Sequence, residues 1–307
     1  AANNGGQSLG STPNDGLVYG DKMYVVVDGS NTVEVINKKT MQRIKQIKTT
    51  ELLGAAEGKS PRHIIAGNGH IFFTTYGGYV AAVDTVNFKL TAKYKVGSYP
   101  EGLAGYASSI VVANSDYAKG HGNISIINLG TGEVETRNVE GINNPQKVFI
   151  NNGNVYILDW VYYEGEYPNS VEKGESAIKY LAGNKATKVT DAYYASMLNG
   201  KLYIISNPYA VAKYSVCDLN SNPYQGTTTP LNLSEGVFSP AGIDVDPATG
   251  EIFVLSYNQG ENGYADYYSN GYVKRYSKNG SYMYSYDTGV GPCAVFFNVG
   301  VKTIFDN

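Results

Sequence analysis

The sequence predicts an all-β fold, a seven-bladed β-propeller, and three observations lead to this prediction. One phrase recurs along the chain, each copy is followed by short strand patterns, and Asn/Gly turns separate those patterns. The phrase reads as a turn, a proline, two residues, an apolar pair, a second turn and an apolar run. Copies lie at Pro13, Pro61, Pro100, Pro145, Pro240 and Pro292, with a weaker one without proline at Ala192.

The spacing of the copies is what favours a propeller. Successive copies are 39 to 52 residues apart, and a period of about 40–50 residues with four strands per unit is typical of propeller blades. A β-sandwich would also contain many short strands, but it does not explain a repeat that runs the full length of the chain.

Each unit reads as four strands in order. "GNGHIFFTT" and "NNGNVYILD" each combine a strand, an Asn/Gly turn and a second strand. Third strands follow in "TVEVINKKT" and "YVAAVDTVN", and fourth strands in "MQRIKQIK" and "KLTAKYKV". The proline stands where the chain enters the innermost strand, a position at which a missing N–H does little harm.

The count gives six full units and one additional first strand, "GPCAVFFN", at Gly291–Asn298. The opening "AANNGGQSLGST" is too short and too polar to supply three further strands. We therefore expect that closing strands of the seventh blade once preceded Ala1, and that residues 1–307 form a single domain. A six-bladed ring with an appended strand is the alternative.

Composition excludes several classes of protein. The chain has 307 residues, 17% charged residues and a net charge of −3, so nothing in its overall charge favours nucleic acid. No stretch approaches the roughly 20 apolar residues needed to span a bilayer. Tyrosine is abundant, at 28 residues against 9 Phe and 1 Trp, and it suits both β-structure and contact surfaces.

The sequence predicts neither an enzyme nor a metal site. Its three histidines, His63, His70 and His121, lack paired ligand spacing. Nucleophile-elbow and phosphate-loop motifs are absent from the sequence as well. The residues that follow the repeat prolines are mixed rather than a ring of carboxylates. They are Asn14, Arg62, Glu101, Gln146, Ala241 and Cys293.

The loops that follow the second strand of each unit are the most informative feature. Because that strand ends on the face where the first strand begins, these loops should share one rim. Two of them, at 159–176 and 257–271, exceed the length of a hairpin and are rich in tyrosine. Long loops on a rigid scaffold are often functional, and aromatic and amide groups together suit a large neutral ligand.

The chain resembles the YncE-like surface-layer propellers exported by Gram-negative gut bacteria, most closely the BtuG-type surface lipoproteins. The matching segments are "GQSLGSTPNDGLVYGDKMYVVVDGSNTVEVINKKT", "DVDPATGEIFV" and "DTGVGPCAVFF". The resemblance implies capture of cobalamin (vitamin B12) at the outer cell surface and its transfer to a TonB-dependent outer-membrane transporter. It also implies a membrane attachment only through a lipid anchor upstream of Ala1.

Cobalamin is the expected ligand, and no catalytic cofactor is expected. Carboxylates and amides would bind the corrin amides, Arg62 would meet the phosphate or an amide oxygen, and Trp160 with the tyrosines would flank the ring. The alternatives are a surface-layer or adhesion scaffold without a small ligand and a lactonase-like propeller hydrolase. The expected ligand-binding residues are Asp15, Asp28, Arg62, Tyr76, Glu101, Asp116, Gln146, Asp159, Trp160, Tyr194, Tyr209 and Tyr257.

Overall fold

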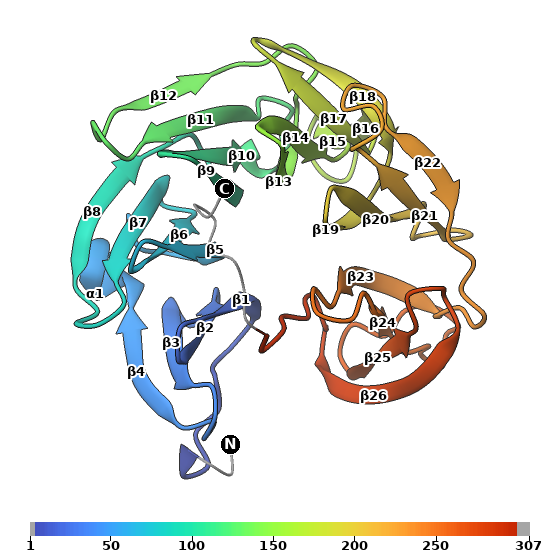
Figure 1. The fold of residues 1–307 in the computed structure, drawn as a ribbon, viewed down its shortest axis with the longest axis horizontal. Coiled ribbons are helices and arrows are strands. Elements are labelled where there is room, and N and C mark those ends of the chain that lie inside the picture. Colours follow the sequence, from blue (N-terminus) through green and yellow to red (C-terminus); the bar gives the residue numbers. More distant parts are fainter. Residues whose placement is uncertain (1–3, 300–307) are drawn as a thin grey trace. The chain divides into compact units, whose positions relative to one another are not determined.

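The computed structural model describes residues 4–299, and these form six four-stranded sheets and one small two-stranded sheet (Figure 1). We call each four-stranded sheet a blade. In every blade the strands are neighbours in the order in which they occur in the chain. The chain divides into two compact units, one with residues 4–175 and 181–187 and the other with residues 176–180 and 188–299 of the described part.

The first three blades lie wholly in the first unit. Blade 1 contains β1 (Pro13–Tyr19), β2 (Lys22–Val27), β3 (Thr32–Asn37) and β4 (Arg43–Lys48). The short helix α1 (Thr49–Leu53) leads into blade 2, which contains β5 (Pro61–Gly67), β6 (His70–Thr75), β7 (Tyr79–Asp84) and β8 (Leu90–Lys95). Blade 3 contains β9 (Pro100–Tyr106), β10 (Ser109–Asn114), the 3-10 turn η2 (Asp116–Ala118), β11 (Asn123–Asn128) and β12 (Val134–Arg137).

The remaining blades follow the same plan. Blade 4 contains β13 (Pro145–Asn151), β14 (Asn154–Asp159), β17 (Ala177–Ala182) and β18 (Lys185–Asp191). Blade 5 contains β19 (Tyr194–Leu198), β20 (Lys201–Ser206), β21 (Lys213–Asp218) and β22 (Thr227–Pro230). Blade 6 contains β23 (Ser239–Val245), β24 (Ile252–Tyr257), β25 (Asn270–Tyr276) and β26 (Tyr282–Val290).

The core lies between neighbouring blades, because successive side chains of a strand point to opposite faces. In β6, Phe73 packs with Tyr24 and Val33 of blade 1, whereas the adjacent Phe72 packs with Leu103 and Ile110 of blade 3. Both faces of the inner strands are therefore buried, which is why these strands read as continuous apolar runs rather than as an alternation.

The prediction of seven blades is wrong, since the described residues form six. The segment Gly291–Asn298, expected as the first strand of a seventh blade, contains no strand. A strand needs a ladder partner, and no further hairpin follows this segment within the described part of the chain. The expectation of closing strands before Ala1 rested on that seventh blade and lies outside the described residues.

Gly291–Asn298 nevertheless packs against blade 6. The Val295 N–H donates to Asp244 Oδ2 at 2.7 Å, and the Val295 side chain packs against the buried cluster of Ala241, Leu255 and Val273. The Ile64 N–H, at the equivalent position of the repeat phrase, donates to Asp15 Oδ2 at 3.1 Å. The copy at Pro292 thus also donates a backbone hydrogen bond to an aspartate of the preceding repeat, although it contains no strand.

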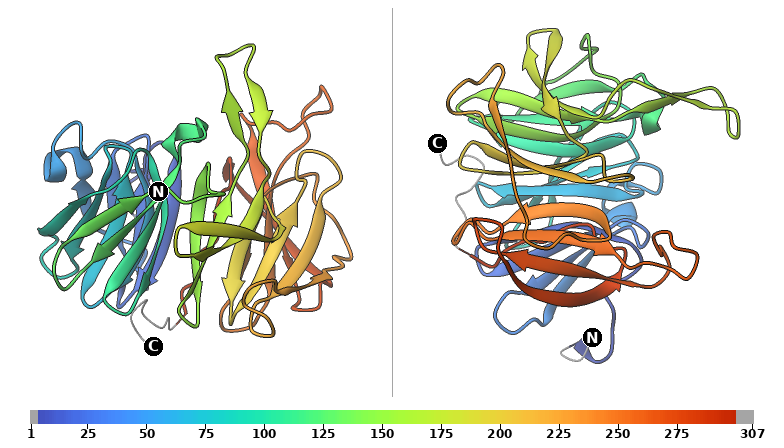
Figure 2. Two further views of the ribbon diagram at one scale, coloured as in Figure 1. Left: turned by 90° about the horizontal axis from the view of Figure 1, so that it is seen from above. Right: turned by 90° about the vertical axis from the view of Figure 1, so that its right-hand side faces the viewer.

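The long loop at 159–176 contains a structure of its own. Strands β15 (Tyr162–Glu164) and β16 (Val171–Lys173) pair as an antiparallel two-stranded sheet, and this hairpin extends away from the other strands of its unit (Figure 2). Tyr167 at its tip is 92% exposed. Separately, within residues 4–299, no helix has the length and apolar character required to cross a bilayer.

Candidate ligand-binding site

In the innermost strands β1, β5 and β13, the residue after the repeat proline lies at an irregularity of the strand. Such bulges bend the strand and redirect a side chain, and they are common beside functional sites. The register shifts fall between Pro13 and Asp15 in β1, between Pro61 and Ile64 in β5, and between Pro145 and Lys147 in β13.

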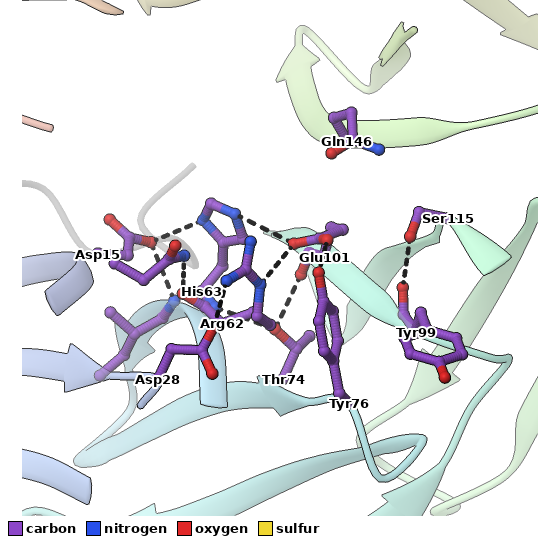
Figure 3. A network of polar contacts seen from close by, with 12 residues as sticks. Asp15, Asp28, Arg62, His63, Thr74, Tyr76, Tyr99, Glu101, Ser115 and Gln146 are labelled. Carbon is purple, nitrogen blue, oxygen red and sulfur yellow. Dashed lines mark hydrogen bonds and ion pairs between the residues drawn. The ribbon is translucent and has the colours of Figure 1, made fainter. Parts of the chain in front are cut away.

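These irregularities bring polar side chains from three neighbouring inner strands together (Figure 3). Asn14 of β1 donates from Nδ2 to the Arg62 carbonyl at 2.6 Å. Arg62 of β5 donates from Nε to Glu101 Oε2 of β9 at 2.9 Å and from Nη1 to Asp28 Oδ2 at 2.6 Å. The position after the proline therefore links blades 1, 2 and 3 directly.

Tyr76, just after β6, completes the surroundings of the guanidinium. The Arg62 guanidinium lies over the Tyr76 ring, 4.8 Å from its centroid, and the Tyr76 hydroxyl donates to Glu101 Oε1. Both oxygens of the buried Glu101 carboxylate are thus engaged, and cation–π and ionic contacts hold Arg62 in one orientation. We call Asp15, Asp28, Arg62, His63, Tyr76 and Glu101 the Arg62 network.

The charge states within the network follow from these contacts. Burial alone would lower the pKa of Arg62, but the Glu101 and Asp28 carboxylates outweigh it and raise that pKa, so the guanidinium stays charged. Burial first, and then the neighbouring Glu101, raises the pKa of Tyr76, so the phenol stays a neutral donor. Arg62 and Tyr76 therefore both act as hydrogen-bond donors at neutral pH.

His63 joins the network from β5. Its Nδ1 lies 3.0 Å from Asp15 Oδ2, and its Nε2 lies 3.8 Å from Glu101 Oε2. Asp15 also accepts the Gly16 N–H at 2.8 Å and the Ile64 N–H at 3.1 Å. Burial alone would raise the pKa of Asp15. The hydrogen bond with His63, together with smaller favourable contacts, outweighs burial and lowers the pKa of Asp15.

Asp15 should make stability depend on pH in a defined way. Because its folded pKa is lowered, its contribution is fully present above the unfolded value of about 3.9 and is lost as pH falls through the folded value. We expect Asp15→Asn to lower the free energy of unfolding by about 1–2 kcal/mol at pH 7, with the difference shrinking below about pH 4. Urea unfolding of both proteins from pH 3 to 7 measures this.

The exposed Asp287→Asn of β26 is the matched control for this experiment. It should change stability by less than about 0.5 kcal/mol at either end of the pH range. An Asp15→Asn difference that stays constant down to pH 3 would contradict the lowered pKa.

The Arg62 network also presents groups that no described residue uses. Among residues 4–299, nothing bonds to Arg62 Nη2 or to the second oxygen, Oδ1, of Asp28. The side chains of Arg62, Asp28 and His63 are 19%, 17% and 19% exposed. The site thus offers a fixed donor and a fixed acceptor to solvent.

The remaining predicted residues of the first unit occupy different positions. Asp116 is half-buried and begins η2, beside Tyr117. Gln146 donates from Nε2 to Asn144 Oδ1 at 2.6 Å and lies apart from the Arg62 group (Figure 3). Asp159 is fully buried and accepts the N–H of Asn144 at 2.7 Å.

Trp160, the last of these, is half-buried at the end of β14. Its backbone N–H donates to the Asn144 carbonyl at 3.0 Å. Asp159 and Trp160 therefore fix the chain entering β13, which is a structural role.

Two tyrosines and a histidine that the sequence analysis did not select extend the site. The Tyr99 ring lies 5.1 Å from the Tyr76 ring and 5.1 Å from the Tyr117 ring, so these three form an aromatic wall beside the Arg62 network. A signal for Tyr99 and His63 was available, because they lie one residue before and two residues after a repeat proline. Tyr117 carried no such positional signal.

The three predicted tyrosines of the second unit come together there. Tyr194, Tyr209 and Tyr257 cluster with Tyr193 and Tyr267. Within residues 4–299, no group of three or more His, Cys, Asp or Glu side chains is placed to hold a metal ion.

Comparison with known sequences identifies the family. The family model described as "Domain of unknown function (DUF5074)" matches residues 1–297. The chain belongs to the DUF5074 family. Among curated proteins, nothing matches this DUF5074 chain.

Solved structures establish the fold of this DUF5074 chain as a β-propeller. Hydrazine synthase of Kuenenia stuttgartiensis superposes with a TM-score of 0.60 at 15% identity, over 79% of this chain and 80% of that one. The computationally designed Ika8 protein gives 0.58 at 9% identity, over 95% and 91%. The WD40 repeats of RRP9 give 0.55 at 7% identity, over 88% and 78%. At such identities the likeness concerns fold alone.

Proposed function

We propose that this DUF5074 protein is an exported binding protein without catalytic activity, which captures cobalamin at the outer cell surface and passes it to a TonB-dependent transporter. The observation that carries the proposal is the Arg62 network, with Arg62 fixed between Asp28 and Glu101 while a guanidinium N–H and a carboxylate oxygen remain open to a ligand. The resemblance to BtuG-type lipoproteins supplies the candidate ligand.

Stability alone gives a weak reason for such a network. Charged groups lose hydration when they are buried, and well-packed apolar residues often stabilise a protein as much as a buried ion pair. The Glu101 side chain is only 6% exposed, yet it binds a guanidinium and a phenol at the edge of solvent. Groups held rigidly in this way lose little entropy on binding, which favours ligand recognition.

The chemistry of the network favours carboxamides. A primary amide needs one donor for its carbonyl and one acceptor for its N–H groups, and Arg62 Nη2 and Asp28 Oδ1 provide them. Cobalamin carries several such amides around the corrin ring. Tyr76, Tyr99 and Tyr117 provide aromatic surface beside these groups, as is typical of sites for large organic ligands.

The same charges disfavour a role of Arg62 in phosphate binding. Arg62 already pairs with both Asp28 and Glu101, so the two carboxylates beside it carry more negative charge than its guanidinium neutralises. An added anion would be repelled by the surplus carboxylate. Of the two roles expected for Arg62, contact with an amide oxygen is therefore the one that we propose.

Titration calorimetry with cyanocobalamin tests the proposal. We expect the wild type to bind with a sub-micromolar Kd and Asp28→Asn, which replaces an acceptor oxygen with an NH2 group or reorients it, to weaken binding about tenfold. Glu251→Gln is the control, because Glu251 also binds an arginine, Arg275 at 2.7 Å, but in the second unit. It should leave the affinity unchanged.

Absence of heat with the wild type would overturn the cobalamin proposal. Wild-type binding that Asp28→Asn leaves intact would instead place the ligand outside the Arg62 network. Hydrolysis of lactones by the wild type would favour the lactonase-like alternative.

A further inference from the structure

Five clustered tyrosines of the second unit form a feature that is separate from the Arg62 network. The Tyr193 ring lies 5.0 Å from the Tyr194 ring and 5.2 Å from the Tyr209 ring, nearly perpendicular to the latter. The Tyr257 and Tyr267 rings lie 4.7 Å apart. Edge-to-face contacts of this kind fix the orientation of aromatic rings. We call Tyr193, Tyr194, Tyr209, Tyr257 and Tyr267 the tyrosine platform.

Some rings of the platform are exposed to solvent and others are half-buried. Tyr209 is 70% exposed and Tyr267 is 53% exposed, whereas Tyr193, Tyr194 and Tyr257 are half-buried. Two further rings, Tyr264 and Tyr268, stand on the same loop as Tyr267 and are 75% and 91% exposed. Concentrated exposed aromatic surface marks an interaction site more often than scattered single residues do.

The loop that carries Tyr267 is held in shape by its own hydrogen bonds. The Gly260 N–H donates to the Tyr264 carbonyl at 2.8 Å, and the Asp266 N–H donates to the Asn258 carbonyl at 2.9 Å. Asp266 Oδ1 in turn accepts the Tyr268 N–H at 2.9 Å. A loop closed in this way is pre-organised, so binding need not first order it.

The platform is electrically neutral but can form hydrogen bonds. Burial chiefly, and then the neighbouring phenols, raises the pKa of Tyr194, so its hydroxyl stays protonated at neutral pH. The Tyr209 hydroxyl donates to the Tyr193 hydroxyl at 3.1 Å. Asp266 also lies on the loop. The hydrogen bond from the Tyr268 N–H is the largest of the contacts that lower the pKa of Asp266, and these contacts hold its charge within the turn.

Neutral rings with hydroxyl edges match the chemistry of a neutral sugar. A pyranose presents a C–H face that stacks on an aromatic ring and hydroxyl edges that exchange hydrogen bonds with phenols. A charged ligand would find no fixed counter-charge among the five platform side chains. We propose that the tyrosine platform is a binding site for neutral oligosaccharides, independent of the cobalamin function proposed for the Arg62 network.

Titration calorimetry with maltohexaose, cellohexaose and mannohexaose tests this site. We expect at least one of these to bind the wild type, and Tyr209→Ala and Tyr267→Ala each to weaken that binding about tenfold. Tyr209→Phe keeps the ring and should stay within about threefold of the wild type. Thermal melts of each variant establish that it is folded.

Tyr284→Ala is the matched control for the platform. Tyr284 is 57% exposed and its ring lies 4.7 Å from the Tyr286 ring, but it lies on β26 outside the platform. It should leave sugar binding unchanged, as should Asp28→Asn of the Arg62 network.

Three results would overturn the proposal. The first is that the wild type binds none of the three hexasaccharides, and the second is that Tyr284→Ala weakens binding as much as Tyr209→Ala. The third is that the platform variants leave sugar binding intact and change only the oligomeric state, which would identify the platform as a protein contact. Loss of cobalamin binding alone does not affect this proposal, because the two sites have separate variants.

Discussion

Arg62→Met is expected to lower the free energy of unfolding by about 3–5 kcal/mol, the usual cost of removing one partner from a buried ion pair. Arg62 is the positive partner of both Asp28 and Glu101. Without it, the 6% exposed Glu101 side chain keeps the Tyr76 hydroxyl and the more distant His63 Nε2, at 3.8 Å, as its partners within the Arg62 network. The carboxylate would then take up a proton or draw in water, and either outcome costs stability.

Arg275→Met provides the comparison for Arg62→Met. Arg275 pairs with Glu251 at 2.7 Å and lies 6.0 Å from the Phe253 ring centroid, so it repeats the ion pair and the aromatic contact. Its side chain is 33% exposed, and because solvent screens this ion pair we expect a much smaller loss than for Arg62→Met. Urea unfolding of both variants measures the difference.

A double variant isolates the cause of the loss. If the stranded carboxylate is responsible, Arg62→Met combined with Glu101→Gln should be more stable than Arg62→Met alone, because the neutral amide costs less to bury. Equal stability of the single and double variants would contradict this explanation.

Gly102→Ala is expected to cost about 3 kcal/mol or more, although it adds a single carbon. A Cβ at Gly102 of β9 would lie 2.7 Å from the Gln146 carbonyl oxygen and 2.8 Å from Lys147 Cα, both backbone atoms of β13. Backbone cannot rotate away as a side chain tip can, so blades 3 and 4 would have to separate at their inner strands.

The same substitution at other glycines gives a graded control. At Gly242, the equivalent position of the repeat phrase, the nearest backbone atom would be the Cys293 carbonyl oxygen at 3.2 Å, and we expect a loss of about 1 kcal/mol. At Gly236 a Cβ would meet nothing within 4 Å, so stability should change by less than about 0.5 kcal/mol. Thermal melts that rank the three variants otherwise would contradict the packing argument.

The repeat phrase predicted the inner strands well because proline and turn chemistry are local. β1, β5, β9 and β13 each begin at the proline that was selected from the sequence. The number of blades could not be read from the phrase in the same way. The copy at Pro292 even keeps the backbone contact to Asp244, but a strand requires a ladder partner that a sequence pattern cannot guarantee.

The Arg62 network was only partly predictable, since its contacts join residues about 40 positions apart in the chain. Arg62 and Glu101 were found because both follow a repeat proline, and the structure joins them. His63 was missed because the β5 bulge decides which of two adjacent side chains faces Asp15. Asp159 was predicted as a ligand-binding carboxylate of the 159–176 loop, but the structure buries it, and its carboxylate accepts the Asn144 N–H before β13.

The segment after β26 acts as a cover for blade 6. Val295 shields Ala241 and Leu255, and the Phe297 ring packs 5.3 Å from Phe253. A shortened version of the chain that stops before Gly291 would expose these apolar side chains to water, and such a version should aggregate when it is produced. Shortened forms intended for crystallisation or for fusion to other proteins should therefore retain the residues through Phe297.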